Sequence, residues 1–283
     1  SSNNYEFFTD EIDGNQIFFN LCSANYTELV NLYLSSKKEE IDDYINQNKF
    51  NDINNKIIEA LGENKLDVAY YLMLQLDHFP ERLFQERTGI TKIAFPPTFK
   101  SIGRGLFCKC SSLDYVSIPD SVHSIEYYGF ACSSLKKITI PSSVVNLGIC
   151  IFRECSSLRQ VTLSSSLTVI GMETFYYCSS LTHVKIPLSV ANLERNAFKG
   201  CSSLTHITIP SSVYYIGRSC FNKCTSLKYV TFVTPSCTCD IGKGAFCDCS
   251  SLKQITIPSS VTSIGDSAFE GCSSLSKITI PSS

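Results

Sequence analysis

A period of about 23 residues runs through the last two-thirds of the chain. Each copy carries a Cys, a Leu three residues later, a pair of apolar residues and, near its end, a Phe. The repeated Cys positions are Cys110, Cys132, Cys155, Cys178, Cys201, Cys224, Cys249 and Cys272. A fixed period of this length is typical of a solenoid, because one coil cannot bury its own apolar side whereas stacked coils share a continuous core.

Each copy predicts one short strand. In the copy at residues 252–258, Leu252, Ile255 and Ile257 give the alternating pattern L-x-x-I-x-I, and Pro258 ends it by removing a backbone donor. The segment from Ile90 to Phe95 fits as a first copy without Cys. The closing Phe occurs in every later copy, at Phe107, Phe130, Phe152, Phe175, Phe198, Phe221, Phe246 and Phe269. We therefore expect a buried column of Leu, Ile and Phe.

Residues 252–272 match the pattern L-x-x-I-x-I-P-x-S-V-x-x-I-G-x-x-A-F-x-x-C almost letter for letter. In this the chain resembles the BspA-like leucine-rich repeats of bacterial and protozoan surface proteins, over about residues 90–283. The departures are Ser164 in place of Pro, one residue missing before Cys132, and extra residues around "TPSCTC". The resemblance implies a curved solenoid used for binding, often for adhesion to host proteins or other cells, and a place at the cell surface or outside the cell.

The first 86 residues differ in charge and in pattern. They contain sixteen acidic and six basic residues, a balance of −10, whereas residues 87–283 contain ten and eighteen, a balance of +8. Residues 51–77 show helical apolar spacing on both sides of Gly62 and resemble the helix-turn-helix of a degenerate ankyrin repeat, without its T-P-L-H opening. The fold class expected is thus an α+β repeat protein, with an α-helical, ankyrin-like module at 1–86 and a leucine-rich repeat solenoid of eight to nine coils at 87–283. The short connection at residues 77–89 favours stacking of the module on the first coil.

The chain contains fifteen Cys, and eight of them share one position of the repeat. Free Cys is among the most buried residue types, so a packing ladder of mainly reduced thiols explains their spacing. A local disulfide or a metal site within residues 237–249 is the alternative. His183 and His206 occupy equivalent positions in successive coils, where a metal pair or a pH sensor is the alternative to two solvated rings. We expect neither a metal nor a cofactor.

The outward positions of the strands form a basic stripe. Eight of the eighteen basic residues of the solenoid lie at these x positions, against the single acidic residue Asp114. A basic stripe on the concave face attracts anions, although Lys and Thr are also ordinary solvated residues of strands. The candidate binding residues are Lys92, Tyr115, Lys136, Lys137, Arg159, Gln160, His183, Lys185, His206, Lys228, Tyr229, Lys253 and Lys277.

The function expected is recognition of a protein or an acidic glycan by the concave face, without catalysis. The sequence contains no G-x-S-x-G, no Gly-rich phosphate loop and no H-E-x-x-H. Tyr115 and Tyr229 are the only aromatic residues of the stripe, which argues against nucleic acid, and no apolar run is long enough for a membrane span. An intracellular scaffold or a structural spacer is the alternative, with a cytoplasmic location. Because the chain begins without Met or a signal pattern and ends within a repeat, we expect it to be a piece of a longer protein.

Overall fold

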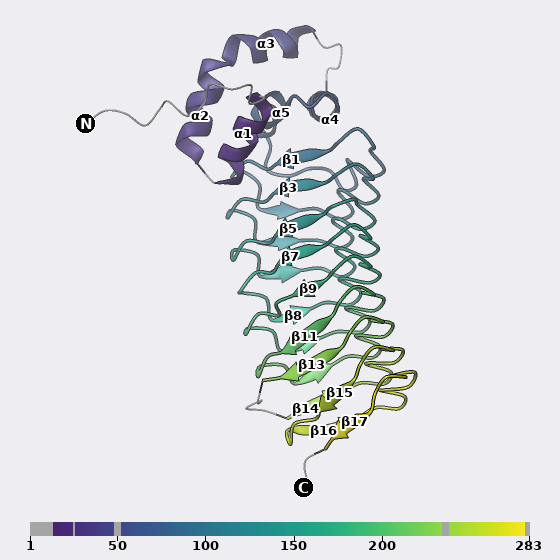
Figure 1. Cartoon of the computed structure of the whole chain (residues 1–283). Helices are drawn as coiled ribbons and strands as arrows, with labels where there is room; N and C mark the ends of the chain where they lie inside the picture. Colours follow the sequence, from purple (N-terminus) through teal and green to yellow (C-terminus); the bar gives the residue numbers. More distant parts are fainter. Residues whose placement is uncertain (1–13, 25, 48–51, 234–237, 281–283) are drawn as a thin grey trace, which may run out of the picture.

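The computed structural model describes residues 14–24, 26–47, 52–233 and 238–280. A group of helices lies at the N-terminal end of a long, gently curved stack of coils (Figure 1). The helices are α1 (Gly14–Ser23), α2 (Thr27–Ser36), α3 (Lys38–Gln47), α4 (Ile53–Gly62) and α5 (Leu66–Met73).

The helical module has its own small core. The Asp52 side chain caps α4 by accepting from the backbone N–H of Asn55 at 3.2 Å. The Phe18 ring of α1 is fully buried and lies 5.3 Å from the rings of Tyr33 in α2 and Tyr70 in α5, measured between centroids. Since α4 and α5 pack directly on each other, the two helices on either side of Gly62 form the expected hairpin.

The first strand of each coil lies where the L-x-x-I-x-I pattern predicts it. These strands pair in parallel and in register in three consecutive groups, β1–β3, β5–β7–β9 and β11–β13–β15–β17. Their bounds are β1 (Lys92–Ala94), β3 (Tyr115–Ser117), β5 (Lys137–Thr139), β7 (Gln160–Thr162), β9 (His183–Val184), β11 (His206–Ile209), β13 (Tyr229–Phe232), β15 (Gln254–Thr256) and β17 (Lys277–Thr279). We call their outward side the strand face.

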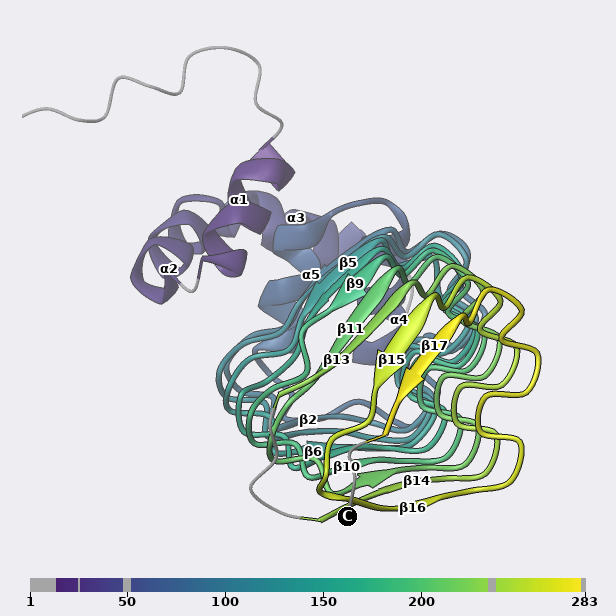
Figure 2. The ribbon, with the colours of Figure 1, turned by 60° about the horizontal axis from the view of Figure 1, so that its bottom comes forward.

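A second row of parallel strands, in sheets of three and five strands, follows the second apolar pair of each repeat, where the sequence analysis predicted no strand. Figure 2 shows it on the wall of the coils opposite the first sheet. Its strands are β2 (Ser101–Ile102), β4 (Ser124–Ile125), β6 (Asn146–Leu147), β8 (Val169–Ile170), β10 (Asn192–Leu193), β12 (Tyr215–Ile216), β14 (Cys239–Ile241) and β16 (Val261–Ile264). Most are two residues long, too short for an alternating pattern to be recognised.

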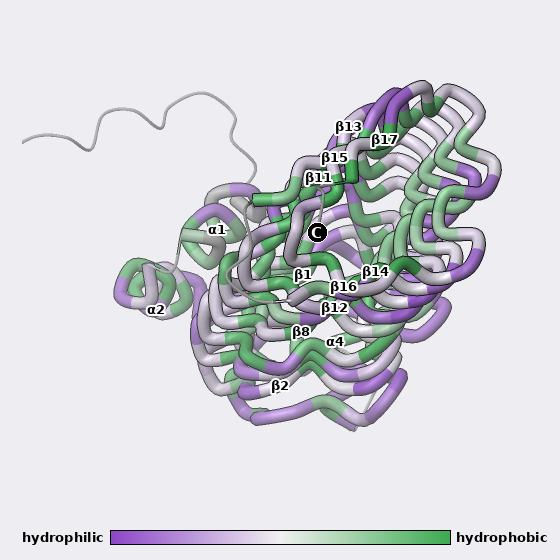
Figure 3. Tube along the Cα trace, turned by 90° about the horizontal axis from the view of Figure 1, so that it is seen from below, coloured by the Kyte–Doolittle hydropathy of each residue, from purple (hydrophilic) through white to green (hydrophobic). Residues whose placement is uncertain are grey.

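The closing Phe residues form a stacked column inside the coils. Neighbouring rings lie 5.1 to 5.8 Å apart between centroids, and their planes differ by at most 16°. Hydrophobic residues line the inside of the coils and hydrophilic residues the outer corners (Figure 3). The repetition therefore makes one continuous core, as the pattern predicts. The column runs through Phe84, Phe107, Phe130, Phe152, Phe175, Phe198, Phe221, Phe246 and Phe269.

The solenoid begins before residue 87. Phe84 already belongs to the Phe column, stacked 5.3 Å from Phe107. The N–H of Glu86 donates to the carbonyl of Cys108 at 2.9 Å, and one coil later the N–H of Lys109 donates in the same way to Ala131 at 2.7 Å. A boundary between residues 86 and 87 thus cuts through the first coil. The closing turn at Phe84 was missed because no strand precedes it in the described residues between α5 and β1.

Seven of the eight repeated Cys form a buried ladder. Each thiol donates to the main-chain carbonyl of the Phe in the preceding coil, at sulfur–oxygen distances of 2.8 to 3.2 Å. Burial raises the pKa of the Cys110 and Cys155 thiols to about 12, so the thiolate is disfavoured. The fourteen described cysteines are free thiols. The ladder consists of Cys110, Cys155, Cys178, Cys201, Cys224, Cys249 and Cys272.

Cys132 does not belong to the ladder, contrary to the repeat alignment. Its φ of 55° matches that of Lys109 and Glu154, the residues that precede the ladder position in neighbouring coils. The ladder position is taken by Ser133, which is 4% exposed and whose N–H donates to the carbonyl of Phe130 at 3.2 Å. This coil is one residue shorter after Ser133 rather than before Cys132, so the shared letters C-S-S-L placed Cys132 one residue out of register.

Candidate functional site

The strand face presents two rows of side chains on each coil. In β5, Lys137 and Thr139 are exposed on either side of the buried Ile138. The parallel register places Lys137 beside Gln160 and Thr139 beside Thr162. Side chains from successive coils are therefore neighbours, although they are about 23 residues apart in the sequence.

Seven of the eight basic residues of the stripe are exposed; Lys137 and Lys277 lie within strands, and the other five lie one residue beyond the end of a strand. The one acidic residue among them, Asp114, is half-buried and contacts the Lys136 ammonium, with 3.5 Å between Oδ2 and Nζ. The exposed members are Lys136, Lys137, Arg159, Lys185, Lys228, Lys253 and Lys277. The strand face thus keeps a strong positive excess.

The two histidines and the second tyrosine of the prediction also lie on this face. His183 and His206 are exposed, and each Nδ1 lies within 3.4 Å of the hydroxyl of the preceding Thr. Tyr229 pairs in register with His206 on one side and with Gln254 on the other. The part of the chain that the structure describes contains no cluster of three metal-ligating side chains.

Lys92 and Tyr115 are partly covered by the helical module, unlike the other candidate binding residues. The Lys92 ammonium donates to Oε1 of Gln16 in α1 at 2.9 Å and lies over the ring of Phe19. The edge-to-face ring contact between Phe19 and Tyr115 has a centroid distance of 4.7 Å. The helical module lies against the first coils, as the short connection predicts, and α1 covers this end of the strand face.

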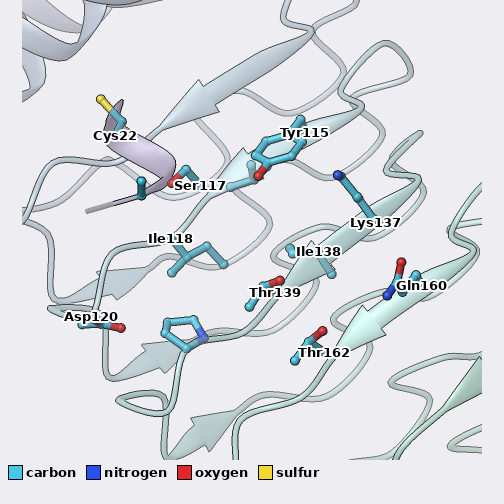
Figure 4. Close-up of a pocket in the computed structure, with 13 residues that line it drawn as sticks. Cys22, Tyr115, Ser117, Ile118, Asp120, Lys137, Ile138, Thr139, Gln160 and Thr162 are labelled. Carbon is cyan, nitrogen blue, oxygen red and sulfur yellow. The ribbon is translucent and has the colours of Figure 1, made fainter. Parts of the chain in front are cut away.

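A hollow of about 520 Å³ lies where the end of α1 overhangs β3, β5 and β7. Figure 4 shows side chains from these strands around it, with the last turn of α1 at one side. Its volume is within the range of small-ligand sites. The lining residues are Cys22, Ala24, Tyr115, Val116, Ser117, Ile118, Asp120, Lys137, Ile138, Thr139, Pro141, Gln160 and Thr162.

The lining of the hollow combines an apolar floor with polar groups. Ile118 and Ile138 lie at its centre, and Lys137 and Asp120 lie at opposite ends (Figure 4). The Lys137 ammonium is 5.4 Å from the centroid of the Tyr115 ring. A cation at one end and a carboxylate at the other can select a ligand with an anionic group and hydrogen-bond donors.

The sequence analysis identified strand residues that line this hollow but not the residues at the end of α1. Lys137, Gln160 and Tyr115 were among the candidates because they occupy outward strand positions. Cys22 belongs to α1 and Ala24 follows its end, and no sequence signal relates α1 to strands about 90 to 140 residues later.

A separate polar cluster lies on the outer turns. Arg153 donates to the carboxylates of Glu173 and Glu154 and lies over the Tyr176 ring, 4.4 Å from its centroid. The Cys150 thiol contacts Glu173, with 3.8 Å between sulfur and oxygen. The Arg153 guanidinium offsets one of the two carboxylate charges and ties neighbouring coils together, which is a structural role.

None of the described helices is long and apolar enough to cross a bilayer.

Several solved structures share the solenoid fold. A leucine-rich repeat protein from Bacteroides ovatus ATCC 8483 is 25% identical, with a TM-score of 0.51, over 73% of this chain and 64% of that one. The T. pallidum leucine-rich repeat protein TpLRR is 28% identical, with a TM-score of 0.50, over 54% of this chain and 72% of that one. A leucine-rich cell surface protein from Faecalibacterium prausnitzii A2-165 is 30% identical, with a TM-score of 0.44, over 71% of this chain and 62% of that one.

The chain spans less than two-thirds of the length of the Bacteroides and Faecalibacterium proteins. A search among curated proteins found no match. The model of the BspA type leucine rich repeat region matches residues 77–204 and 192–283, with six copies. Its start at residue 77 agrees with a first coil that precedes residue 87. Since this match covers more than half of the chain, the protein belongs to the BspA-type leucine-rich repeat family.

Proposed function

We propose that this protein is a non-enzymatic recognition protein that binds an acidic partner on its strand face. The observation that carries the proposal is the set of seven exposed basic side chains along that face, opposed at the stripe positions by Asp114 and beside them by Asp120, which lines the hollow. Family membership supports a repeat protein that presents a binding surface, and the resemblance to surface proteins supports adhesion at the cell surface as its role.

The charge pattern favours a long-range electrostatic attraction. The exposed basic residues come from six coils, and adjacent coils lie within one Debye length, about 8 Å at physiological ionic strength. Their fields therefore add before contact, which raises the association rate of an anionic partner. The acidic helical module lies at the end of the stack, so its own carboxylates leave the middle of the strand face open.

The test uses two polyanions and a neutral polymer as probes: polyglutamate, hyaluronan and dextran. We expect the intact chain to bind at least one polyanion and not dextran. The affinity should fall steeply between about 0.01 M and 1 M salt, over which the Debye length falls from roughly 30 to 3 Å. Biolayer interferometry measures both the affinity and the association rate.

A pair of charge-reversed variants separates the strand face from the rest of the surface. The first changes Arg159, Lys185 and Lys228 to Glu and should slow association by at least tenfold. The matched control changes Lys199, Arg218 and Lys223 to Glu, which alters the net charge by the same amount. It should bind as the unmodified chain does, because these residues lie outside the strand face. Equal binding by both variants, or an affinity that does not change with salt, would show that the strand face is only a solvated surface.

A further inference from the structure

The hollow between α1 and strands β3, β5 and β7 carries an inference that rests on the proposed function and names its ligand. We propose that this hollow is a subsite for one acidic sugar residue, a pyranose ring bearing a carboxylate, with the carboxylate against Lys137 and the ring hydroxyls toward Asp120 and Gln160.

Three polar side chains around the hollow have no hydrogen-bond partner among the described residues. Among the described residues, the amide of Gln160 and the hydroxyls of Thr139 and Thr162 make no hydrogen bond to other protein groups, although they lie side by side in register around the hollow. Each of these groups can both donate and accept. Sugar hydroxyls also donate and accept, so a pyranose can bond to all three.

The hollow carries opposite charges at its two ends. The Lys137 ammonium lies at one end and the Asp120 carboxylate at the other (Figure 4). A carboxylate on the sugar forms a charge-assisted bond with Lys137, and hydroxyl donors at the far end of the same ring meet Asp120. A ligand with several carboxylates and no side-chain donor, such as an acidic peptide, is repelled at Asp120.

The base of the hollow is apolar. Ile118, Ile138 and Pro141 give the hollow an apolar base below the polar rim. A pyranose ring has an apolar face of C–H groups with its hydroxyls around the edge, which matches an apolar floor with a polar rim. The Tyr115 ring is held in place by Phe19 of α1, so this wall is formed before a ligand arrives.

The backbone of the strands beside the hollow is already paired. Strand β7 pairs with β5 on one side and with β9 on the other. A peptide that binds by adding a strand needs a free strand edge. Strand β7 offers none, and β3 and β5, although not hydrogen-bonded to each other, lie too close together for another strand to enter between them. Side chains alone recognise the ligand here, which suits a sugar.

The test measures binding of a hyaluronan tetrasaccharide, whose glucuronate residues carry the carboxylate, by calorimetry with the intact chain. The same tetrasaccharide with its carboxylates reduced to alcohols is the matched neutral probe. We expect Lys137→Met to weaken binding of the acidic probe at least tenfold and to leave binding of the reduced probe unchanged. Gln160→Leu and Tyr115→Phe should weaken both probes several-fold, because they remove hydrogen bonds to hydroxyls.

Lys277→Met changes the same row of the strand face away from the helical module and should weaken binding less than Lys137→Met does. The controls are Lys223→Met and Tyr214→Phe, which change the same residue types outside the strand face. Both should bind the tetrasaccharide as the unmodified chain does, and all variants should keep the unmodified circular dichroism spectrum. An equal loss in Lys137→Met and Lys277→Met would overturn the subsite and leave a general attraction along the stripe. Polyglutamate binding that depends on Lys137 as strongly as sugar binding does would assign the hollow to a peptide and overturn the sugar. If polyglutamate binds and the tetrasaccharide does not, the subsite fails and the proposed function stands; if neither polyanion binds, both fail.

Discussion

Replacing Phe198 with Ala tests whether the stacked Phe column holds the solenoid together. The Phe198 ring is fully buried and stacks on Phe175 and Phe221, at centroid distances of 5.1 and 5.2 Å. Truncation leaves a cavity that both neighbours border and that the tightly packed coils fill only in part. Buried Phe-to-Ala changes cost about 3 to 5 kcal/mol, and the loss of two stacked partners places this one toward the upper end.

Phe269 offers a matched comparison at the end of the same column. Its ring is only half-buried and stacks on Phe246 alone, 5.6 Å away. Phe269→Ala should therefore cost about 1 to 2 kcal/mol, because less apolar area is returned to water. Lys199→Ala should be nearly silent, since the Lys199 carbonyl that accepts from Tyr177 is kept in the Ala variant.

Thermal and urea unfolding followed by far-ultraviolet circular dichroism measure these losses. For a unit of this size, 3 to 5 kcal/mol corresponds to a fall in Tm of about 6 to 20 °C. The expected order of the losses is Phe198→Ala, then Phe269→Ala, then Lys199→Ala. Equal losses for the two Phe variants would refute the stacked column as a main source of stability, and an equal loss for Lys199→Ala would refute the register of the repeat.

The remaining predictions concern the cysteine ladder. Cys178→Ala should lower the free energy of unfolding by about 0.5 to 1.5 kcal/mol, because the carbonyl of Phe152 loses one of its two donors and keeps the N–H of Cys155. Cys132→Ala should change it by no more than about 0.5 kcal/mol, and an equal loss from the two would contradict the assignment of Ser133 to the ladder. Stability should also fall as pH rises from about 8.5, the ordinary thiol pKa of the unfolded chain, through about 12, the raised pKa of Cys110 and Cys155 in the fold. The folded state then binds more protons than the unfolded state, so its stability is complete below the lower value and is lost through the higher one. Urea titrations across this pH range measure the loss, and unchanged unfolding midpoints would contradict it.

The repeat is the part of the fold that could be predicted in full. Ile255 and Ile257 alternate as a strand requires, and the column position of Phe198 recurs in every copy, so local pattern and period agree on one solenoid. The predictions went wrong where the pattern was interrupted. The closing turn at Phe84 has no Cys, so an alignment on Cys did not find it. The coil of Cys132 is one residue short, so the same alignment placed Cys132 one residue out of register.

The outward strand residues could likewise be named from the sequence, because a period of two fixes which side chains leave the core. The register of the parallel strands then determines which of these side chains are neighbours. Parallel pairing places Lys137 beside Gln160, and this follows from the repeat length alone.

Only the tertiary structure shows that α1 covers one end of the strand face. The contact of Phe19 with Tyr115 joins a helix to a strand about 96 residues later, and no periodicity links the two. Helix α1 packs there because its apolar side, together with α5, covers the end of the first coil, which would otherwise leave the core exposed. The sequence by itself determined a basic stripe along a solenoid; the docking of the helical module, driven by burial of apolar surface between distant segments, turned one end of that stripe into a hollow.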